Sequence, residues 1–372
     1  MTGASFSLET MFFWNREEMM IGTVKSPRLA SLLAGAAMAV LGLAGSASAQ
    51  DVIKLKLHHF LGPKAPAQTD MLEPWAERIE KASEGRVDIE IFPAMSLGGR
   101  PPELIRQARD GVVDIIWTVN GYTAGLFPRS EVFELPFIHT NDPVATNLAM
   151  RDMFDAHLAE EYQGVKVLFS HVHAGQAIQM VDTEVRKPSD LAGKQIRIPT
   201  RTGAWVVEAL GASPVSMPVP DLPQALSRKV VDGAFIPWEI IPALKMQDLT
   251  DYQIEGADKT RFGTTTFQVS MNQAKWDSLP EDIQQIFLDN SGEDWSREVG
   301  EIWRAIDDRG IEVATDAGNT HVTLTAEETE AFRTQLEPVV ERWIEEVDAK
   351  GIDGRALVDA ARAAIAKHSK GM

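Results

Sequence analysis

Strands and helices alternate after residue 50, and this alternation constrains the fold more than any other feature of the sequence. Residues 52–58 predict a strand, and apolar residues then recur at helical spacing up to Gly85, a typical residue beyond a helix C-terminus. Residues 87–91 alternate as a second strand, and a helix that begins with two prolines is expected over 101–109. The apolar run at 112–118 is typical of a buried parallel strand. This β-α-β-α-β order indicates a doubly wound α/β sheet.

A second α/β unit follows a polar stretch at residues 170–176, where we expect the chain to cross between domains. Residues 177–181 and Gln195–Ile198 predict strands, and helices are expected over 203–210 and 221–229. In both units a helix returns through a short Val-Asp segment to a buried strand. This internal similarity suggests two related lobes.

The rest of the chain is expected to join the two units. Residues 264–271 are apolar and β-branched and could carry the chain back to the first unit. Apolar residues over 281–315 are spaced for one long helix, and two more amphipathic helices are expected at about 326–350 and 355–367. Three helices are more than one lobe needs, so we expect them to brace both.

Residues 1–49 read as an N-terminal extension followed by a secretory signal. Lys25 and Arg28 precede an apolar run at 29–43, and an Ala-Ser-Ala motif ends at Ala49. The apolar run is short for a membrane span. We therefore expect export and cleavage after Ala49; an uncleaved N-terminal anchor is the alternative.

Charge and cysteine content exclude several functions. The chain has 54 acidic and 36 basic side chains, a formal net charge of -18, which repels nucleic acids and anionic lipid surfaces. An anionic ligand would therefore need local positive charge. The absence of cysteine excludes disulfides, thiol catalysis and cysteine-ligated metals, and is compatible with a bacterial periplasm.

Arg197 is the first candidate binding residue. In the strand Gln195–Ile198, Ile196 and Ile198 would lie on one face and Arg197 on the other, and Pro199 ends the strand. An arginine at the end of a core strand, just before a helix, lies where α/β proteins bind small anions. The alternative is an exposed surface arginine.

Two further segments follow predicted buried strands, where open α/β sheets bind ligands. Asn120 and Tyr122 follow the last strand of the first unit, and Trp238 and Glu239 follow residues 234–236 of the second. For Trp238, pocket lining and core packing are equally open.

The sequence shows no catalytic machinery. Neither a G-x-S-x-G nor an H-E-x-x-H motif occurs. His171 and His173 would share a strand face and could begin a metal site, but no third ligand is evident at similar range, and hydrogen bonding at a domain crossing is the alternative. His58 and His59 would point to opposite faces, so at most one lines a pocket. We predict no cofactor and no metal.

Short motifs over most of the chain carry a family resemblance. They are, in order, 85–87 (GRV), 91–93 (IFP), 97–99 (LGG), 110–114 (DGVVD), 135–137 (LPF), 188–199 (PSDLAGKQIRIP), 210–212 (LGA), 231–233 (VDG), 271–272 (MN) and 276–280 (WDSLP). Together they resemble the substrate-binding proteins of tripartite ATP-independent periplasmic (TRAP) transporters, the DctP family.

The resemblance implies an α/β, two-lobed periplasmic-binding-protein-like fold. It has a central cleft, hinge strands and long C-terminal helices that brace both lobes. On this basis lobe I is predicted to comprise residues 50–174 plus about 263–300, and lobe II residues 175–262 plus about 301–372.

The resemblance also implies a role for Arg197. In that family the arginine of the K-x-I-R-x-P segment pairs with the carboxylate of the ligand, and Arg197 occupies this position. The planar guanidinium can donate to both carboxylate oxygens, which a lysine does less well. Many members carry a second basic residue where this chain has Gln176, and an asparagine where it has Trp238. These departures favour a monocarboxylate with an apolar or aromatic body.

We therefore predict a periplasmic solute-binding receptor, not an enzyme. It is expected to bind a small organic acid through Arg197 and deliver it to the small and large permease subunits of a TRAP transporter, with no nucleic-acid partner and no membrane insertion after signal cleavage. The residues expected to set specificity are Gln176, Trp238, Asn120, Tyr122, His59 and Glu239.

Two alternatives stay open at this point. One is an exported enzyme, such as a lyase, that acts on a carboxylate through His171, His173 or Glu239. The other is a sensor or scaffold with the same fold.

Overall fold

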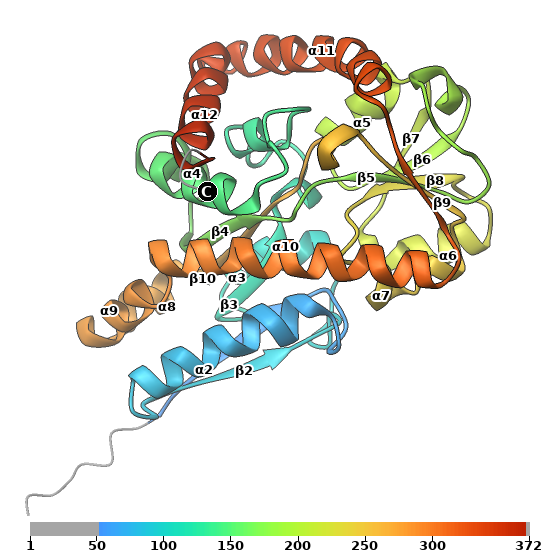
Figure 1. Ribbon diagram of the computed structural model, residues 1–372. Helices are drawn as coiled ribbons and strands as arrows, with labels where there is room; N and C mark the ends of the chain where they lie inside the picture. Colours follow the sequence, from blue (N-terminus) through green and yellow to red (C-terminus); the bar gives the residue numbers. More distant parts are fainter. Residues whose placement is uncertain (1–51, 370–372) are drawn as a thin grey trace, which may run out of the picture. The chain divides into compact units, whose positions relative to one another are not determined.

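The computed structural model describes residues 52–369, which form two β-sheets covered by helices (Figure 1). The first sheet has the strand order β2-β1-β3-β10-β4. In it, β1 is parallel to β2 and β3, whereas β10 is antiparallel to β3 and β4. The strands are β1 (Ile53–His59), β2 (Val87–Phe92), β3 (Ile115–Val119), β4 (Val165–Val172) and β10 (Thr266–Asn272).

The second sheet has the order β11-β9-β5-β8-β6-β7. In it, β6 is parallel to β7 and β8, β11 is parallel to β9, and β5 is antiparallel to β8 and β9. We call the parts built on the first and the second sheet the first and the second lobe. The residue limits given for the lobes in the sequence analysis remain a prediction. The strands are β5 (Ala177–Met180), β6 (Gln195–Ile198), β7 (Ser213–Ser216), β8 (Gly233–Ile236), β9 (Tyr252–Glu255) and β11 (Thr320–Thr323).

Two segments connect the sheets. Residues 173–176 lead from β4 to β5, and residues 256–265 lead from β9 back to β10. The two crossing segments are hydrogen-bonded to each other, because the backbone N–H of Gln176 donates to the carbonyl of Gly263 at 2.8 Å and that of Phe262 donates to the carbonyl of Gln176 at 3.0 Å. The crossing segments lie where the sequence predicts hinge strands, but neither of them is a β-strand.

The helices of the first lobe are short, and α4 and α8 begin at a side-chain cap. Asp142 accepts a hydrogen bond from the N–H of Ala145, and Asn272 accepts one from the N–H of Lys275, each at the start of a helix. The helices and helical turns of this lobe are η1 (Ala67–Leu72), α2 (Glu73–Ala82), η2 (Pro101–Glu103), α3 (Leu104–Arg109), η3 (Asn120–Tyr122), η4 (Ser130–Glu134), α4 (Pro143–Met153), η5 (Phe154–Leu158), η6 (Ala159–Glu161), α8 (Gln273–Ser278) and α9 (Glu281–Asp289).

The second lobe has fewer helices, and the one that follows β6 directly is the most relevant to the site. Thr200 caps it by accepting a hydrogen bond from the N–H of Gly203, so the chain turns from strand to helix just after Arg197. The helices and turns here are η7 (Pro188–Leu191), α5 (Arg201–Ala209), η8 (Val219–Asp221), α6 (Leu222–Ser227), α7 (Ile241–Leu244), η9 (Met246–Asp248) and η10 (Ala257–Lys259).

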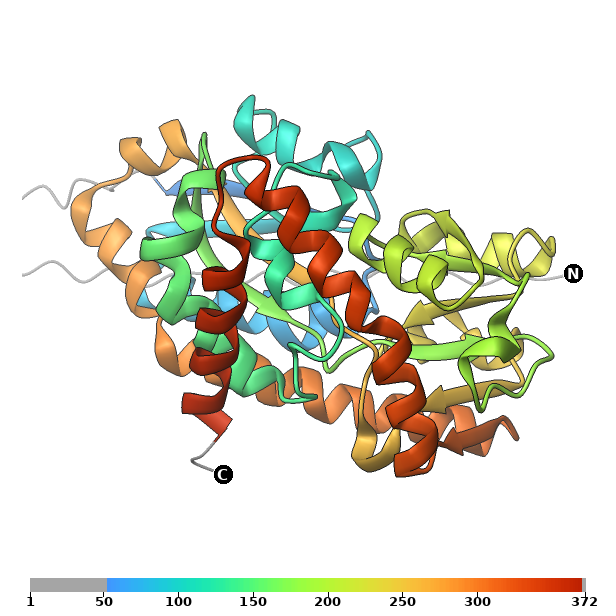
Figure 2. The ribbon, with the colours of Figure 1, turned by 90° about the horizontal axis from the view of Figure 1, so that it is seen from above.

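Three C-terminal helices connect the lobes: α10 (Glu293–Asp316), α11 (Ala326–Asp348) and α12 (Gly354–Ser369). Helix α10 packs on α4 and β4 of the first lobe and on α7 and β11 of the second (Figure 1). Figure 2 shows α11 running across both lobes; it packs on α5, and α12 then packs on α4. These helices therefore brace the two lobes, as predicted.

Two glycines bring α10 against each lobe. A Cβ atom at Gly300 would lie 2.5 Å from the Cα of Val144, and one at Gly310 would lie 2.0 Å from the carbonyl oxygen of Trp238. No side chain fits at either distance. The backbone of α10 therefore rests directly on α4 at one point and on the loop after β8 at another.

Two helix predictions were wrong in extent. Residues 281–315 form two helices, α9 and α10, because the chain turns at residues 290–291 and Gly292, in extended conformation, serves as the N-cap of α10. The second prediction is a helix from about Pro143 to Tyr162, which the sequence also favours; the regular α-helix ends at Met153, and the chain continues through the wider turn η5 and the tighter turn η6.

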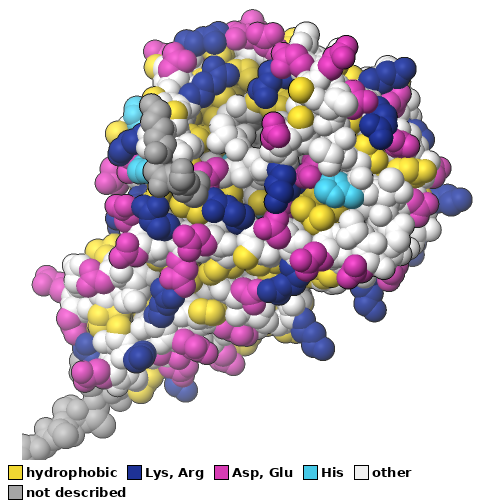
Figure 3. Space-filling view, viewed as in Figure 1, with side chains coloured by type: hydrophobic (Ala, Val, Ile, Leu, Met, Phe, Trp, Pro, Cys, Tyr) yellow, Lys and Arg dark blue, Asp and Glu magenta, His cyan; other side chains and the backbone are white. Residues whose placement is uncertain are grey.

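Acidic and basic side chains are interspersed on the face of the molecule shown in Figure 3. The negative net charge is therefore not gathered into a single patch on that face. Within residues 52–369, no helix combines the length and the apolar character that crossing a membrane requires.

Candidate ligand-binding site

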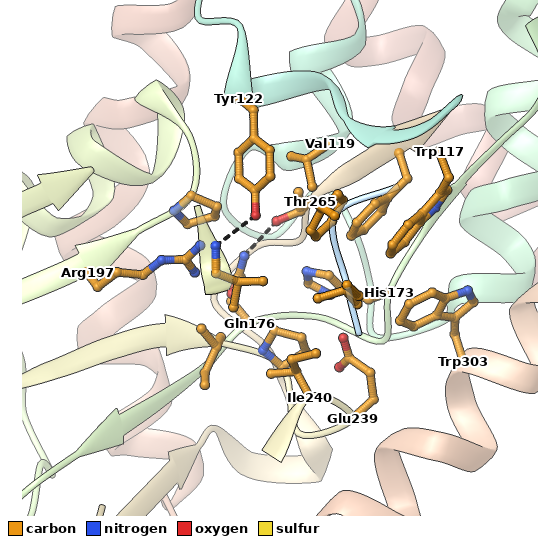
Figure 4. A pocket seen from close by; sticks show the side chains of 17 residues that line it. Trp117, Val119, Tyr122, His173, Gln176, Arg197, Glu239, Ile240, Thr265 and Trp303 are labelled. Carbon is orange, nitrogen blue, oxygen red and sulfur yellow. Dashed lines mark hydrogen bonds between the residues drawn. The ribbon is translucent and has the colours of Figure 1, made fainter. Parts of the chain in front are cut away.

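A cavity lies where the two lobes and the two crossing segments meet (Figure 4). Its wall comes from the ends of β1, β3 and β10 in the first lobe and from the ends of β6 and β8 in the second. Helix α10 closes one side through Trp303. The carboxyl ends of parallel strands thus surround the cavity, as in other open α/β sheets.

Arg197 reaches this cavity from β6 and is 2% exposed. Its Nε donates to the carbonyl of Met217 at 3.0 Å and its Nη1 donates to the carbonyl of Phe235 at 3.4 Å, so two backbone groups fix the guanidinium. Nη2 has no hydrogen-bond partner, and no carboxylate in the described part of the chain forms an ion pair with Arg197.

Burial lowers the pKa of Arg197, and the nearby Tyr122 hydroxyl partly opposes this effect. A guanidinium nevertheless stays protonated in proteins. A buried, unpaired cation is costly, and an anion that enters the cavity would relieve this cost. The geometry is therefore suited to binding a carboxylate.

Tyr122 joins the two lobes beside Arg197. The side chain comes from η3 of the first lobe, and its hydroxyl accepts a hydrogen bond from the N–H of Val219 in η8 of the second lobe at 3.0 Å (Figure 4). Burial raises the pKa of Tyr122 above its ordinary value, so the hydroxyl is neutral. It can therefore donate its own proton to an anion in the cavity.

Gln176 lies in the first crossing segment and is 5% exposed. Its Nε2 donates to Oγ1 of Thr265 in the second crossing segment at 2.8 Å (Figure 4). The Oε1 atom of Gln176 has no partner in the described structure. The two crossing segments thus present a hydroxyl and an amide to the cavity.

Glu239 and His173 add titratable groups to the wall. Glu239 follows β8 and is 5% exposed; burial raises the pKa of its carboxyl well above the ordinary value, and the negative charge of Asp307 raises it further. Burial lowers the pKa of His173 far below its ordinary value. Nδ1 of His173 accepts from the N–H of Gly175 at 3.0 Å, so the neutral ring carries its proton on Nε2. The His173 ring is therefore neutral at neutral pH, and burial favours the protonated form of Glu239.

Four aromatic rings form one part of the wall, beside aliphatic and proline side chains. Trp117 of β3 stacks on Phe60 with centroids 4.8 Å apart and on Phe267 with centroids 5.3 Å apart, and its ring lies 6.4 Å from that of Trp303. All four side chains line the cavity. Stacked and edge contacts with such rings favour a flat, apolar ligand.

Three predicted site residues lie outside the cavity lining. Asn120 uses its amide to bridge the Tyr162 hydroxyl, at 2.9 Å, and the amide of Gln268, at 2.7 Å. Nε2 of His59 is hydrogen-bonded to Oε1 of Gln68 at 3.0 Å. The ring of Trp238 is fully buried, 4.8 Å from the ring of His321. The structure therefore brings together Arg197, Gln176, Tyr122 and Glu239 of the seven predicted residues.

His171 has a different role from His173. Its ring stacks on Phe267, and its Nε2 accepts a hydrogen bond from Nε1 of Trp117 at 2.9 Å. Burial lowers the pKa of His171 to about 3. Among residues 52–369 there is no group of three or more His, Cys, Asp or Glu side chains that could hold a metal ion.

The aromatic wall was missed by sequence reasoning. Trp117 lies in a continuous apolar run and Trp303 at ordinary helical spacing, so neither differs in pattern from a core residue. Thr265 lies in an apolar, β-branched stretch and gave no signal either. These residues come from segments that are distant in the sequence, and only the tertiary structure shows that they line the same cavity.

Two α/β lobes, joined by paired crossing segments around a buried cavity with one unpaired cation, define a two-lobed binding protein. The model of the DctP family, bacterial extracellular solute-binding protein family 7, matches residues 57–346. The chain belongs to this family, and the predicted resemblance is confirmed. The predicted fold class is confirmed by its solved structural neighbours, which are two-lobed TRAP solute-binding proteins.

Three similar proteins illustrate the relationship. A TRAP solute-binding protein from Rhodoferax ferrireducens T118, solved with copurified benzoate, is 39% identical with a TM-score of 0.84, and the match covers 86% of this chain and 99% of that one. A marine metagenome TRAP solute-binding protein specific for aromatic acid ligands, solved with 3-hydroxybenzoate, is 36% identical with a TM-score of 0.83, covering 86% and 99%. The C4-dicarboxylate-binding periplasmic protein DctP of Rhodobacter capsulatus is 27% identical over 350 residues, covering 90% and 98%.

Proposed function

We propose that this protein is the solute receptor of a TRAP transporter and that its ligand is a small aromatic monocarboxylate. The single observation that carries this proposal is the buried guanidinium of Arg197, whose Nη2 has no partner in a cavity that is lined in part by aromatic rings. The carboxylate of the ligand accepts hydrogen bonds from Arg197 and from the Tyr122 hydroxyl. The ring of the ligand packs against Trp117, Phe267 and Trp303.

The balance of charge supports a single carboxylate. Arg197 is the cation that lines the cavity, while Gln176 carries no charge, burial keeps His173 neutral, and burial disfavours a charge on Glu239. A second ligand carboxylate would find no second cation and would lose its hydration. The similar proteins solved with benzoate and with 3-hydroxybenzoate agree with this choice of ligand class.

The proposal includes export and delivery. The chain is exported by its N-terminal signal and cleaved after Ala49, a position outside the described residues. The lobes close around the ligand by bending at the two crossing segments, and the closed form delivers the ligand to the membrane permease subunits. Mass spectrometry of the exported protein tests the first step; a chain that begins at a residue other than Gln50 contradicts this cleavage site.

A ligand screen tests the central assignment. Thermal unfolding of the purified protein should be shifted upward by benzoate, phenylacetate and hydroxybenzoates, and not by succinate or ectoine. Recovery of the ligand unchanged after incubation distinguishes a receptor from an enzyme. Stabilisation by dicarboxylates alone, or turnover of a bound acid, would contradict the proposal.

A further inference from the structure

Glu239 is the titratable group of the cavity with the least obvious structural purpose. It is 5% exposed, it lines the cavity, and its Oε2 has no hydrogen-bond partner in the described structure. Buried polar atoms in folded proteins are nearly always paired. Figure 4 shows the carboxyl reaching the cavity from a different side than Arg197.

The charged neighbours of Glu239 are already engaged with each other. Asp307 of α10 accepts a hydrogen bond from Nη2 of Arg261 at 2.7 Å, and Nη1 of Arg261 lies 2.6 Å from Oε2 of Glu255. Arg261 is therefore committed to two other carboxylates, and no ion pair of Glu239 occurs between residues 52 and 369. The charges of Asp307 and Arg261 act on the Glu239 carboxyl, but neither residue forms an ion pair with it.

We propose that Glu239 reads a hydroxyl group on the ring of the bound aromatic acid, by hydrogen bonds at the side of the cavity away from Arg197. This inference rests on the proposed function, since it assumes that Arg197 holds the carboxylate. Glu239 thereby decides which aromatic acids the receptor prefers.

Because burial favours the protonated form of Glu239, its carboxyl is better suited to a hydroxyl than to a second carboxylate on the ligand. A protonated carboxyl donates one hydrogen bond and accepts others, and a phenolic hydroxyl can both accept and donate. A second carboxylate on the ligand would be opposed by the negative charge of Asp307 near Glu239.

Calorimetric titration with a matched set of ligands tests the proposal. At neutral pH, at least one of 3-hydroxybenzoate and 4-hydroxybenzoate should bind the wild-type protein about tenfold more tightly than benzoate, the size expected for one net hydrogen bond. Glu239→Leu should bring that ratio of affinities to about one, whereas Glu239→Gln, which keeps a donor and an acceptor, should retain most of it. Glu312→Leu, at an exposed position of α10, is the matched control and should leave the ratio unchanged.

A second readout does not depend on the leucine variant folding. The infrared difference spectrum of the wild-type protein should show the carbonyl stretch of a protonated carboxyl shifting when the hydroxylated acid replaces benzoate. The shift should be absent in Glu239→Gln.

Several results would overturn the inference. Equal or tighter binding of benzoate than of both hydroxybenzoates by the wild-type protein would remove Glu239 as a hydroxyl reader while leaving the carboxylate anchor in place. A preference for 3-(aminomethyl)benzoate over the hydroxybenzoates would show an ionised Glu239. Loss of the hydroxyl preference in Gln176→Leu with its retention in Glu239→Leu would assign the role to Gln176. Absence of binding by every aromatic acid would contradict the proposed function itself.

Discussion

Nη2 of Arg261 donates to Oδ2 of Asp307 at 2.7 Å, and this ion pair fastens the second crossing segment to helix α10. Nη1 of the same guanidinium lies 2.6 Å from Oε2 of Glu255, at the end of β9. The side chains of all three residues are at most 5% exposed. The hinge is thus held by a buried charge cluster at the point where it meets the bracing helix.

Replacement of Arg261 should therefore be severe. Arg261→Met leaves two buried carboxylates without their cation, and we expect the free energy of unfolding to fall by about 3–5 kcal/mol. Urea unfolding measures this change. Arg309→Met, which removes an exposed ion pair of α10 with Asp70, is the control and should have little effect. Equal effects of the two variants would contradict the importance of the buried cluster.

Gly310→Ala should disturb both stability and binding. The added methyl group would lie 2.0 Å from the carbonyl oxygen of Trp238, so α10 or the loop that carries Glu239 must shift. We expect a loss of about 1–3 kcal/mol in urea unfolding, together with weaker benzoate binding by calorimetry. At Gly292, the corresponding atom would lie 3.6 Å from the nearest atom, an ordinary contact. A comparable loss in Gly292→Ala would show that the close approach at Gly310 is not the cause.

The buried carboxyl of Glu134 should make the free energy of unfolding depend on pH, and a single substitution can isolate this effect. Its carboxyl accepts hydrogen bonds from Thr266 of β10 and Thr202 of α5, and burial raises its pKa from 4.5 to about 7. Because the folded-state pKa is raised, the stabilising contribution of Glu134 is complete below pH 4.5 and is lost as the pH rises through 7. Glutamine does not titrate, so the Glu134→Gln variant has no contribution at this position that changes with pH.

The measurement is the difference in unfolding free energy between Glu134→Gln and the wild type as a function of pH. It should shift in favour of the variant by about 3 kcal/mol between pH 4.5 and 8. Other titrating groups are common to both proteins and cancel. The exposed, non-titrating substitution Gln163→Ala is the control. A difference for Glu134→Gln that does not vary with pH would show that folding does not raise the pKa of this carboxyl.

Tyr122→Phe removes one hydroxyl and keeps the ring. The variant loses the hydrogen bond from the N–H of Val219, which links the lobes beside Arg197, and the donor proposed for the ligand carboxylate. We expect benzoate affinity to fall by about tenfold, with the ring contact to Phe60 unchanged. Calorimetry measures the affinity, and an unaltered value would remove Tyr122 from the proposed anchor.

Much of the fold could be predicted because local signals agreed with the tertiary structure. Alternation in Gln195–Ile198 and the apolar run before Val119 both became strands of the expected sheets. The break at Gly292 was not predicted, because hydrophobic spacing continues across it and only the N-cap conformation marks the new helix. Spacing reports which face is buried, not where a helix is interrupted.

The site was predictable only in part, for a related reason. Arg197, Gln176, Tyr122 and Glu239 are polar residues next to buried strands, and a polar side chain in such a place stands out. Trp117 and Trp303 are apolar residues in apolar settings, and their part in the cavity follows from contacts between distant segments. Asn120 and His59 stood out equally, but their polar atoms are used in internal hydrogen bonds.

The most direct test is the affinity of benzoate for the wild-type protein and for two variants of Arg197, measured by isothermal titration calorimetry. We predict stoichiometric binding by the wild type, no measurable binding by Arg197→Ala, and a large loss in Arg197→Lys, because a point-charge ammonium cannot present the paired donors of a guanidinium. Retained tight binding in Arg197→Ala, with the fold intact by circular dichroism, would contradict the assignment of Arg197 as the carboxylate anchor.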